Sequence, residues 1–374
     1  MREIQIITRH AVVNYGSVLQ ALATEQFFRN LGYEAYTVDY IPTQDTVRGR
    51  VNAFSHNFTK NPLKRIAYRM LKFPDEWWKE RYFRRYRRDM LHLTAPCHTL
   101  KDLQAHSFGE DALCAGSDQL WGYMPDGEMD PAYFLDFGDA HNARFSYAAS
   151  FGRTDFPEAY YEKAVPLLRR FSFLTVREKS AEELLQAHAG LSAVTILDPT
   201  LMLDRESWLH MAEGKTPKKP YVIVYRLRQN RELDAYAKQY ARQNGWRVVR
   251  ISSSVYDWLG YGEKAILKTP GEVLALFKNA AGVITDSFHA TALSVIFNKP
   301  FVDFLPPKTQ VRITDLLELL GLQDRIWREQ KDPMDGVIDW ERVNALLNEK
   351  RQQATAYITE QLKRTEAQRH ENRM

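Results

Sequence analysis

Apolar and polar positions alternate along this chain in a repeating rhythm of strand and helix. Residues 4–7 form a short apolar run typical of a buried strand, and apolar residues between 19 and 31 recur every three or four positions, as on one helix face. Ser17 is predicted to cap this helix, Gly32 to end it, and residues 35–40 to form a second strand. This order predicts parallel pairing through a right-handed crossover.

The same rhythm continues to about residue 340. Further strands are predicted at 111–115, 145–150, 172–176, 194–197, 221–225, 247–251, 282–285 and 301–304. Helices are predicted at 157–170, 180–188, 231–243, 270–278, 287–297 and 312–320. Strands that alternate with helices in this way indicate an α/β fold with parallel sheets.

A lysine- and proline-rich run at 215–220 separates two such series. We expect one α/β domain over residues 1–205, a second over 206–340, and a helix over 341–374 that packs back on the first domain. The expected architecture is two Rossmann-like, doubly wound domains facing across a cleft. Ligands of such sheets bind at the carboxyl ends of the strands, so we expect the active site in that cleft.

Composition fits a globular protein of this size. The 374 residues suit two domains, and 44% hydrophobic with 26% charged residues is ordinary for packed domains. No apolar run approaches the length of a membrane span, and the N-terminus lacks the features of a secretory signal. Cys97 and Cys114 have no metal-ligand spacing, which favours a reducing, cytoplasmic compartment without disulfides or a metal site.

Positive charge is concentrated in one region, although the net charge is only +4. Thirteen lysines and arginines lie between Arg48 and Arg88, against three acidic residues, and aromatic side chains such as Trp77 alternate with them. We expect a basic aromatic helical insertion at about 48–92. It suits either peripheral contact with an anionic membrane or lipid-linked glycan, or a solvated helix packed on the first domain. Nucleic acid is disfavoured, because no known binding module is present.

The sharpest local pattern lies at 283–292. An apolar strand ends in Asp286 and Ser287, and a helix begins at once. The start of a helix leaves backbone N–H groups unpaired and carries partial positive charge, which suits a phosphate or carboxylate. His289 in the first turn could donate a hydrogen bond or a proton to that anion. The alternative is that Asp286 or Ser287 is a plain helix cap and His289 a structural residue.

Other strand ends carry polar residues in the same way. The candidates are Ser117, Asp118 and Gln119 after the strand at 111–115, Ser150 after 145–149, and Arg177 after 172–176. Arg177 could pair bidentately with a carboxylate or phosphate, or form a salt bridge to Glu178 or another acid.

A turn follows the first strand at Asn14, Tyr15 and Gly16, where backbone could approach a ligand closely. It lacks the glycine spacing of a dinucleotide fingerprint, and the chain contains no P-loop, HExxH or GxSxG motif. A nicotinamide-dependent enzyme, a zinc protease and a serine hydrolase are therefore disfavoured.

Taken in order, these pieces resemble the polysaccharide pyruvyl transferase family. The matching segments are NYGSVLQ at 14–20, AGSDQLW at 115–121, SYAASFG at 146–152, VRE at 176–178, DPT at 198–200, TDSFHA at 285–290 and KPF at 299–301. They cover about residues 3–304 in the order of the family. The resemblance implies a glycosyltransferase-B-like fold.

The resemblance also implies a reaction without a cofactor. A pyruvyl group passes from phosphoenolpyruvate to hydroxyls of a sugar, usually closing a cyclic ketal. The acceptor belongs to a bacterial cell-surface, capsular or exopolysaccharide, or to its lipid-linked precursor. The N-terminal domain would hold the acceptor and the C-terminal domain the donor.

Roles for individual residues follow from the same resemblance. His289 matches the histidine expected to contact phosphate or act as general acid, and Asp118 is the candidate to activate the acceptor hydroxyl. Many members have arginine where this chain has Ser287, which removes one anion contact. The candidate donor-binding residues are Ser287, Asp286, Arg177, Arg226, Lys308 and Arg312. The candidate acceptor-binding residues are Asn14, Tyr15, Gly16, Ser117, Gln119, Trp121 and Ser150.

Two other functions fit the same pattern. One is a glycosyltransferase that uses a nucleotide sugar in the same cleft. The other is a carbohydrate-binding relative that kept the fold and lost catalysis together with the arginine at position 287. Release of phosphate, release of a nucleoside diphosphate, or sugar binding without turnover would separate the three.

Overall fold

The computed structural model describes residues 3–58, 61–109, 111–123, 128–305, 311–329 and 332–371. The chain forms two compact units, the first made of residues 1–202 and 350–374, the second of residues 203–349. The division falls within a few residues of the expected boundary at 205, and the end of the C-terminal helix belongs to the first unit. The expected site between the two domains stays a prediction.

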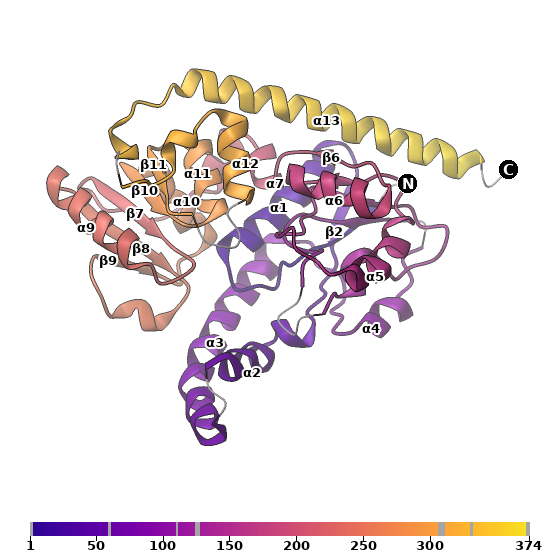
Figure 1. The fold of residues 1–374 in the computed structure, drawn as a ribbon, viewed down its shortest axis with the longest axis horizontal. Coiled ribbons are helices and arrows are strands. Elements are labelled where there is room, and N and C mark those ends of the chain that lie inside the picture. Colours follow the sequence, from indigo (N-terminus) through magenta and orange to yellow (C-terminus); the bar gives the residue numbers. More distant parts are fainter. Residues whose placement is uncertain are drawn as a thin grey trace. The chain divides into compact units, whose positions relative to one another are not determined.

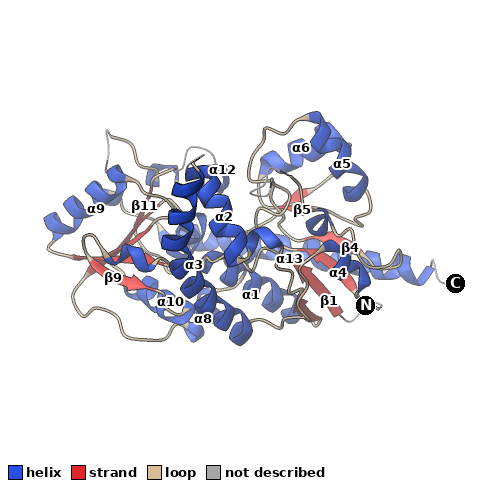
Figure 2. Cartoon of the chain, turned by 90° about the horizontal axis from the view of Figure 1, so that it is seen from below, coloured by secondary structure: helices blue, strands red, loops and turns tan. Residues whose placement is uncertain are grey.

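Unit 1 is built on a parallel sheet with the strand order β2-β1-β3-β4 (Figures 1 and 2). Its strands are β1 (Glu3–Ile7), β2 (Glu34–Thr37), β3 (Ala112–Ala115) and β4 (Arg144–Ser146). Two further parallel strands, β5 (Thr175–Val176) and β6 (Val194–Thr195), form a two-stranded sheet. A single bridge from Ala149, which follows β4, to Val176 of β5 links the two sheets. The order reverses direction between β1 and β3, which makes that point the topological switch point of the sheet.

Helices follow these strands. They are α1 (Tyr15–Asn30), α4 (Leu100–Ala105), α5 (Glu158–Leu168), α6 (Lys179–Ala189) and α7 (Pro199–Met202), with short 3-10 turns η1 (Thr43–Asp45) and η2 (Pro131–Phe134). Three of the helices, α1, α5 and α6, lie where the sequence predicts helices, whereas α4 and α7 were not predicted. The predicted cap of the first helix is wrong. Asn14 is the N-cap and accepts a hydrogen bond from the Gly16 N–H at 2.9 Å, whereas Ser17 is buried inside the first turn.

The basic aromatic insertion is a helical hairpin of α2 (Val47–Phe58) and α3 (Pro62–Met90) (Figure 1). Asn61 starts α3 by accepting from the N–H groups of Leu63 and Lys64. The inner face of α3 packs on the unit, since Phe83 is buried and its ring centroid lies 5.1 Å from that of Tyr15.

Unit 2 contains a five-stranded parallel sheet with the order β11-β10-β7-β8-β9. The strands are β7 (Tyr221–Tyr225), β8 (Arg247–Ser252), β9 (Glu263–Ile266), β10 (Gly282–Thr285) and β11 (Phe301–Asp303). This is a Rossmann-like order with its switch point between β7 and β10. The predicted α/β class is confirmed.

Most helices of unit 2 lie where the sequence predicts them. The helices of this unit are α8 (Arg205–Met211), α9 (Arg231–Asn244), α10 (Pro270–Asn279), α11 (Phe288–Ile296) and α12 (Val311–Leu320), with short turns η3 (Val255–Trp258), η4 (Gln323–Arg325) and η5 (Pro333–Asp335). The last helix, α13 (Trp340–Glu371), begins in unit 2 and ends in unit 1. The strand β9 was not predicted, because its first two residues, Glu263 and Lys264, are charged.

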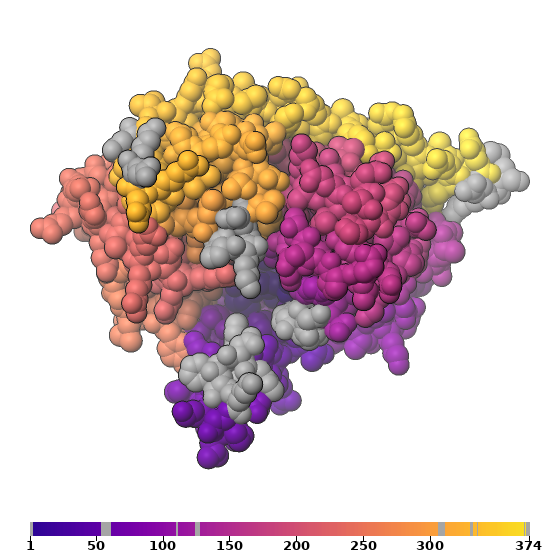
Figure 3. Space-filling view, in the orientation of Figure 1, coloured from indigo at the N-terminus to yellow at the C-terminus, as the bar shows by residue number. Residues whose placement is uncertain are grey.

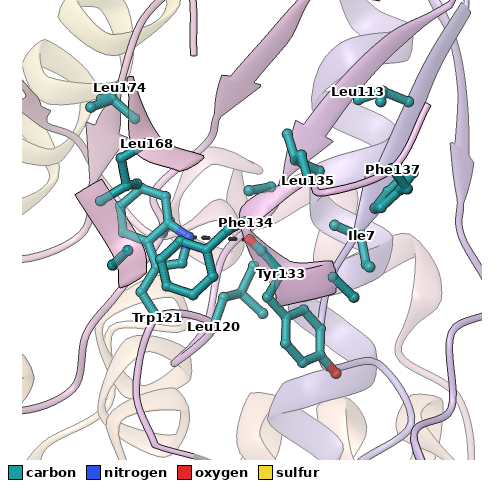
Figure 4. Close-up of a cluster of buried hydrophobic side chains, with 14 of the residues drawn as sticks. Ile7, Leu113, Leu120, Trp121, Tyr133, Phe134, Leu135, Phe137, Leu168 and Leu174 are labelled. Atoms are coloured by element: carbon teal, nitrogen blue, oxygen red, sulfur yellow. Dashed lines mark hydrogen bonds between the residues drawn. The ribbon is translucent and has the colours of Figure 1, made fainter. Parts of the chain in front are cut away.

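A large aromatic core lies in unit 1 (Figure 4). Trp121 is fully buried in it, and its indole N–H donates to the carbonyl of Tyr133 at 3.2 Å. The ring centroids of Trp121 and Phe134 are 6.0 Å apart. The interpretation of Trp121 as an acceptor-binding residue is therefore corrected, because no face of its ring is open to a sugar.

Candidate functional site

Polar groups gather at the switch point of unit 1, where β1 and β3 end side by side. The Thr8 hydroxyl donates to the carbonyl of Ser117 at 2.7 Å, and the Gln20 amide of α1 donates to the Thr8 hydroxyl at 2.8 Å. These bonds tie together the segment after β1, the first turns of α1 and the segment after β3. Asn14 and Asp118 therefore flank one carboxyl edge of the sheet, as ligand-binding residues of such folds do.

Asp118 has an unusual backbone. Its φ is +83°, in the left-handed region that non-glycine residues rarely adopt. The surrounding chain holds it there, since its carbonyl accepts from the Leu120 N–H at 2.8 Å and from the Ser150 N–H at 3.1 Å. Its carboxylate accepts from the Gln119 N–H at 2.9 Å, and 16% of the side chain is exposed. Strain maintained by neighbours at a strand end points to a functional residue.

Arg177 is a buried partner of carboxylates. Its Nη1 donates to Asp198 at 2.6 Å and to the Ser117 hydroxyl at 3.4 Å, and its Nη2 lies 3.6 Å from Asp118. Burial alone would lower the pKa of Arg177, but Asp198 and Asp118 hold that pKa above its usual value. Only 2% of the side chain is exposed. The donor-binding interpretation is corrected, because this guanidinium orients two carboxylates and does not face solvent.

Several predicted acceptor contacts are part of the framework. Ser150 is fully buried and donates to Glu178 at 2.8 Å. Ser117 is fully buried and donates to Asp198 at 3.0 Å, and Tyr15 is buried against Phe83. These three interpretations are corrected, since the side chains are committed to protein groups.

Partly exposed candidates remain beside them. Asn14 and Gln119, like Asp118, keep part of their surface open, whereas Gly16 is buried in the first turn of α1. Their roles toward an acceptor stay predictions.

Sequence reasoning missed two basic residues directly after β1. Arg9 donates to Asp45 at 2.9 Å, and the His10 ring lies 3.1 Å from Asp39 through Nε2. Burial would lower the pKa of Arg9, but Asp45, Tyr133 and Asp118 raise it overall. The sequence contains the pattern that could have found them, because Thr8, Arg9 and His10 directly follow an apolar strand, as the predicted site residues do.

Unit 2 has a matching arrangement where β7 and β10 end. The Thr285 hydroxyl donates to the carbonyl of Tyr225 at 2.6 Å, and the Leu227 N–H donates to Asp286 at 2.7 Å. Burial raises the pKa of Asp286, although the N–H groups of Leu227 and Arg228 and the charge of Arg226 oppose the shift. Asp286 therefore joins the two segments that form this switch point.

Arg226 lies near the carboxyl group of Asp286 but makes its contacts with other groups. Its Nε is 3.2 Å from Asp234, and its Nη1 donates to the carbonyl of Arg228 at 3.0 Å. It contributes positive charge near Asp286. Its use as a donor contact stays a prediction.

His289 lies in the first turn of α11. The residue is buried, with 8% of its surface exposed, and its ring stands edge-on to Phe288, with centroids 5.4 Å apart. The guanidinium of Arg312 on α12 lies 6.0 Å from the Phe288 centroid. Ser287 is the N-cap residue of α11 but makes no side-chain capping bond, and the carboxylate of Asp286 accepts from the Leu227 N–H. Lys308 lies outside the described residues.

The described part of the chain contains no group of three or more His, Cys, Asp or Glu side chains arranged to hold a metal ion. Within the same residues, no helix is both long and apolar enough to cross a bilayer.

Two parallel α/β units, each with polar side chains gathered at its switch point, define a Rossmann-like protein built to bind ligands at the carboxyl ends of its strands. The sequence model of the polysaccharide pyruvyl transferase family matches residues 14–306. The chain belongs to that family, and the predicted resemblance is confirmed.

Comparison with curated proteins finds no match. Among solved structures, the chain is similar to the accessory secretory protein 1, 2 and 3 structure of Streptococcus pneumoniae, with a TM-score of 0.42 and 10% identity, over 71% of this chain and 56% of that one. The UDP-GlcNAc 2-epimerase of Neisseria meningitidis bound to UDP-GlcNAc matches with a TM-score of 0.47 and 6% identity over 97% and 100%.

A Streptomyces glycosyltransferase complexed with thymidine diphosphate matches with a TM-score of 0.44 and 12% identity over 97% and 100%. The chain thus spans little more than half of the first of these structures and nearly all of the other two. A likeness of this degree says nothing about activity.

Proposed function

We propose that this protein transfers a pyruvyl group from phosphoenolpyruvate to hydroxyls of a sugar in a bacterial cell-surface polysaccharide or its lipid-linked precursor. Family membership supports transfer to a polysaccharide. The observation that carries the choice of donor is His289 in the first turn of α11, beside the switch point of unit 2. The N–H groups and partial positive charge of a helix start suit a donor that carries both phosphate and carboxylate.

The proposed chemistry needs one acid and one base. A proton added to the methylene carbon of phosphoenolpyruvate leaves a cation at C2, which a sugar hydroxyl attacks as it loses its own proton. The C2–oxygen bond to phosphate then breaks, and a second hydroxyl closes the ketal. The sum is donor plus diol giving ketal plus inorganic phosphate, so no external cofactor is required.

His289 is the proposed general acid or phosphate contact. An imidazole can donate a proton near neutral pH, and its place beside a helix start puts it near the expected anion. Phe288 stands edge-on to the imidazole, and the guanidinium of Arg312 lies 6.0 Å from the Phe288 ring centroid, adding positive charge to this region.

Asp118 is the proposed base for the acceptor hydroxyl. It keeps part of its carboxylate exposed, while the guanidinium of Arg177 lies 3.6 Å away and fixes its position. Asp198 holds Arg177 from the other side at 2.6 Å. Arg177 and Asp198 are therefore positioning residues in this proposal.

A cytoplasmic location is part of the same proposal. Phosphoenolpyruvate is an intracellular metabolite, and a lipid-linked precursor is exposed to it on the cytoplasmic face of the membrane. Cys97 and Cys114 are both free and buried, which suits a reducing compartment.

The decisive measurement is phosphate release with phosphoenolpyruvate and a panel of sugar acceptors. Matched reactions contain UDP- or dTDP-sugars in place of phosphoenolpyruvate. Phosphate release that depends on the acceptor, with a mass gain of one pyruvyl group on the product, supports the proposal. Release of nucleoside diphosphate would instead identify a glycosyltransferase, and sugar binding without any turnover would identify a binding protein.

Replacing His289 tests its role directly. We expect His289→Ala to lower kcat about 10²–10⁴-fold, the usual contribution of a general acid. A loss confined to KM would assign it to phosphate binding. His210→Ala, an exposed histidine on α8, is the matched control and should retain activity. Wild-type kcat and KM in His289→Ala, with thermal unfolding unchanged in both variants, would remove His289 from the reaction.

A further inference from the structure

One outward stripe runs the length of α3. Leu63, Ile66, Met70, Phe73 and Trp77 are exposed and spaced three or four residues apart, so they share one helix face. Two of them, Leu63 and Met70, are 76% and 72% exposed. Surface apolar groups this extensive and contiguous mark an interaction site.

The same face becomes cationic along the second half of the helix. Arg81, Arg84 and Arg88 continue the spacing of the apolar residues, and all three are exposed. Hereafter the α3 stripe means Leu63, Ile66, Met70, Phe73, Trp77, Arg81, Arg84 and Arg88. Trp77 stands at the change from apolar to basic, with the Arg81 guanidinium 5.8 Å from its ring centroid.

The opposite face holds α3 to unit 1, so the stripe must point outward. Glu80, at the edge of the stripe, is buried, and it accepts from Arg87 at 2.7 Å and from Arg50 of α2 at 3.1 Å. Phe83 packs against Tyr15 of α1. Figure 1 shows α2 and α3 side by side, and Figure 3 shows residues of this region at the surface of the molecule.

The arginines line a pocket of about 440 Å³ at the basic end of the stripe. Arg81, Arg84, Arg85 and Arg88 outnumber the two acidic residues of the lining, Glu80 and Asp89. The pairs within it are loose, with Arg84 3.6 Å from Glu80 and Arg85 3.5 Å from Asp89, and both arginines are largely exposed. Such a pocket suits a phosphate group, which arginine recognises well.

We propose that the α3 stripe docks the protein on a bilayer of anionic phospholipid. The apolar half would enter the boundary between headgroups and acyl chains, Trp77 would sit at the interface, and the arginines would bind lipid phosphates. A single occupant then explains both halves of the stripe. Nucleic acid would leave the apolar half without a partner, and a second copy in parallel would set arginine against arginine.

This inference is independent of the reaction proposed above. It concerns where the protein works and adds a partner of stated chemistry. If the acceptor is lipid-linked, docking would also raise its local concentration at the sheet edge of unit 1.

The test uses the full-length protein and vesicle flotation. Vesicles of phosphatidylcholine mixed with phosphatidylglycerol are compared with pure phosphatidylcholine, at low and at high salt. We expect binding to the anionic vesicles at low salt and weakening at high salt, because salt screens exposed charges. Equal recovery with both lipids, or no recovery with either, would overturn the proposal.

Matched variants locate the contact. Arg81→Gln with Arg88→Gln should weaken binding about 25-fold, at about fivefold for each arginine. Arg231→Gln with Arg242→Gln removes the same charge from exposed positions of α9 and should change binding less than twofold. Similar losses in both pairs would show nonspecific attraction and reject the stripe.

The apolar half has its own test. Leu63→Gln with Met70→Gln should reduce binding at low salt while the size of the protein in solution and its phosphate release with a water-soluble acceptor stay unchanged. Unchanged vesicle binding would refute insertion. A change of oligomeric state in this variant, without loss of vesicle binding, would instead identify a second copy as the occupant.

Discussion

The Asp118 backbone lies in the left-handed region at φ +83°, next to Arg177 and in a segment fixed by the Ser150 N–H. A non-glycine residue in that region costs about 1 kcal/mol or more. Glycine would adopt the same backbone freely, yet the chain has a carboxylate here. Such a choice is expected where the side chain serves the ligand and the rest of the fold offsets the strain.

Two replacements of Asp118 separate strain from chemistry. Both Asp118→Gly and Asp118→Ala remove the carboxylate, so both should lose phosphate release to a similar extent. Asp118→Gly should be the more stable of the two by about 1 kcal/mol, because alanine must adopt a left-handed backbone. Urea unfolding measures the difference. Alanine more stable than glycine, the order at ordinary positions, would contradict the strain argument.

Buried polar residues show a limit of sequence reasoning at this scale. Arg177, Ser117 and Ser150 follow strands, as binding residues do, but the fold surrounds them with Asp198 and Glu178. A strand end places a side chain at the right edge of the sheet. Which end keeps an open surface depends on neighbours that are distant in the sequence.

At the scale of elements, the start of α1 is where local sequence and site coincide. The Asn14 side chain accepts from the Gly16 N–H at 2.9 Å and so caps the helix that leaves the switch point of unit 1. Ser17 was predicted as the cap because its hydroxyl precedes the apolar run. Asn14 is the N-cap instead, because Tyr15 and Gly16 already have helical backbone and Ser17 is buried.

Replacing the cap distinguishes its structural role from ligand binding. Asn14→Ala should lower the free energy of unfolding by about 1 kcal/mol, whereas Asn14→Asp keeps a capping oxygen and should retain stability. If the amide also contacts the acceptor, KM for the sugar will rise in both variants. Thermal unfolding and acceptor titrations give the two readouts. Equal stability of Asn14→Ala and wild type would show that the cap is unimportant.

Across the whole molecule, the direction in which a carboxyl pKa is shifted depends on burial and on the neighbours of each group. In unit 1, burial opposes but Arg87 and Arg50 lower the pKa of Glu80, and His10 lowers that of Asp39. In unit 2, burial and the nearby Asp286 raise the pKa of Asp303 well above its usual range. The pKa of Glu272, on the surface of unit 2, is lowered by Lys268, although partial burial opposes that shift.

These pKa shifts predict that, as the pH falls, unit 1 loses its folded structure before unit 2. A carboxyl group with a lowered folded-state pKa stabilises the fold above its unfolded pKa, and that stability is lost as the pH falls through the folded value. Asp303 has the opposite effect, because protonation removes the cost of burying its charge. Its contribution to the stability of the fold therefore becomes more favourable as the pH falls. Hydrogen exchange with mass spectrometry from pH 7 to about pH 2 should show earlier loss of protection in unit 1, beginning at about pH 4, the usual pKa of aspartate and glutamate.

Asp303→Asn is the control for that experiment. It should stabilise unit 2 near neutral pH, and the gain should shrink as the pH approaches the usual range of aspartate. Earlier exposure of unit 2 in wild type would contradict the assignment of the shifts.

The order of strands and helices, the class of fold and the family came from the sequence itself. Apolar spacing is local, so it is visible in a few consecutive residues, and the ordered motifs from Asn14 to Pro300 point to one family. The same alternation places Asp118 at the carboxyl edge of the sheet of unit 1 and His289 at that of unit 2, since parallel strands of one sheet all end at one edge.

Only the tertiary structure decided which of the candidate site residues are open to a ligand. Trp121 lies in the aromatic core, Arg177 is enclosed by Asp198 and Asp118, and Arg9 joins the same polar edge although no motif singled it out. Burial is the sum of contacts between segments far apart in the chain. Residues that look alike in sequence therefore diverge once the sheet brings different neighbours to each of them.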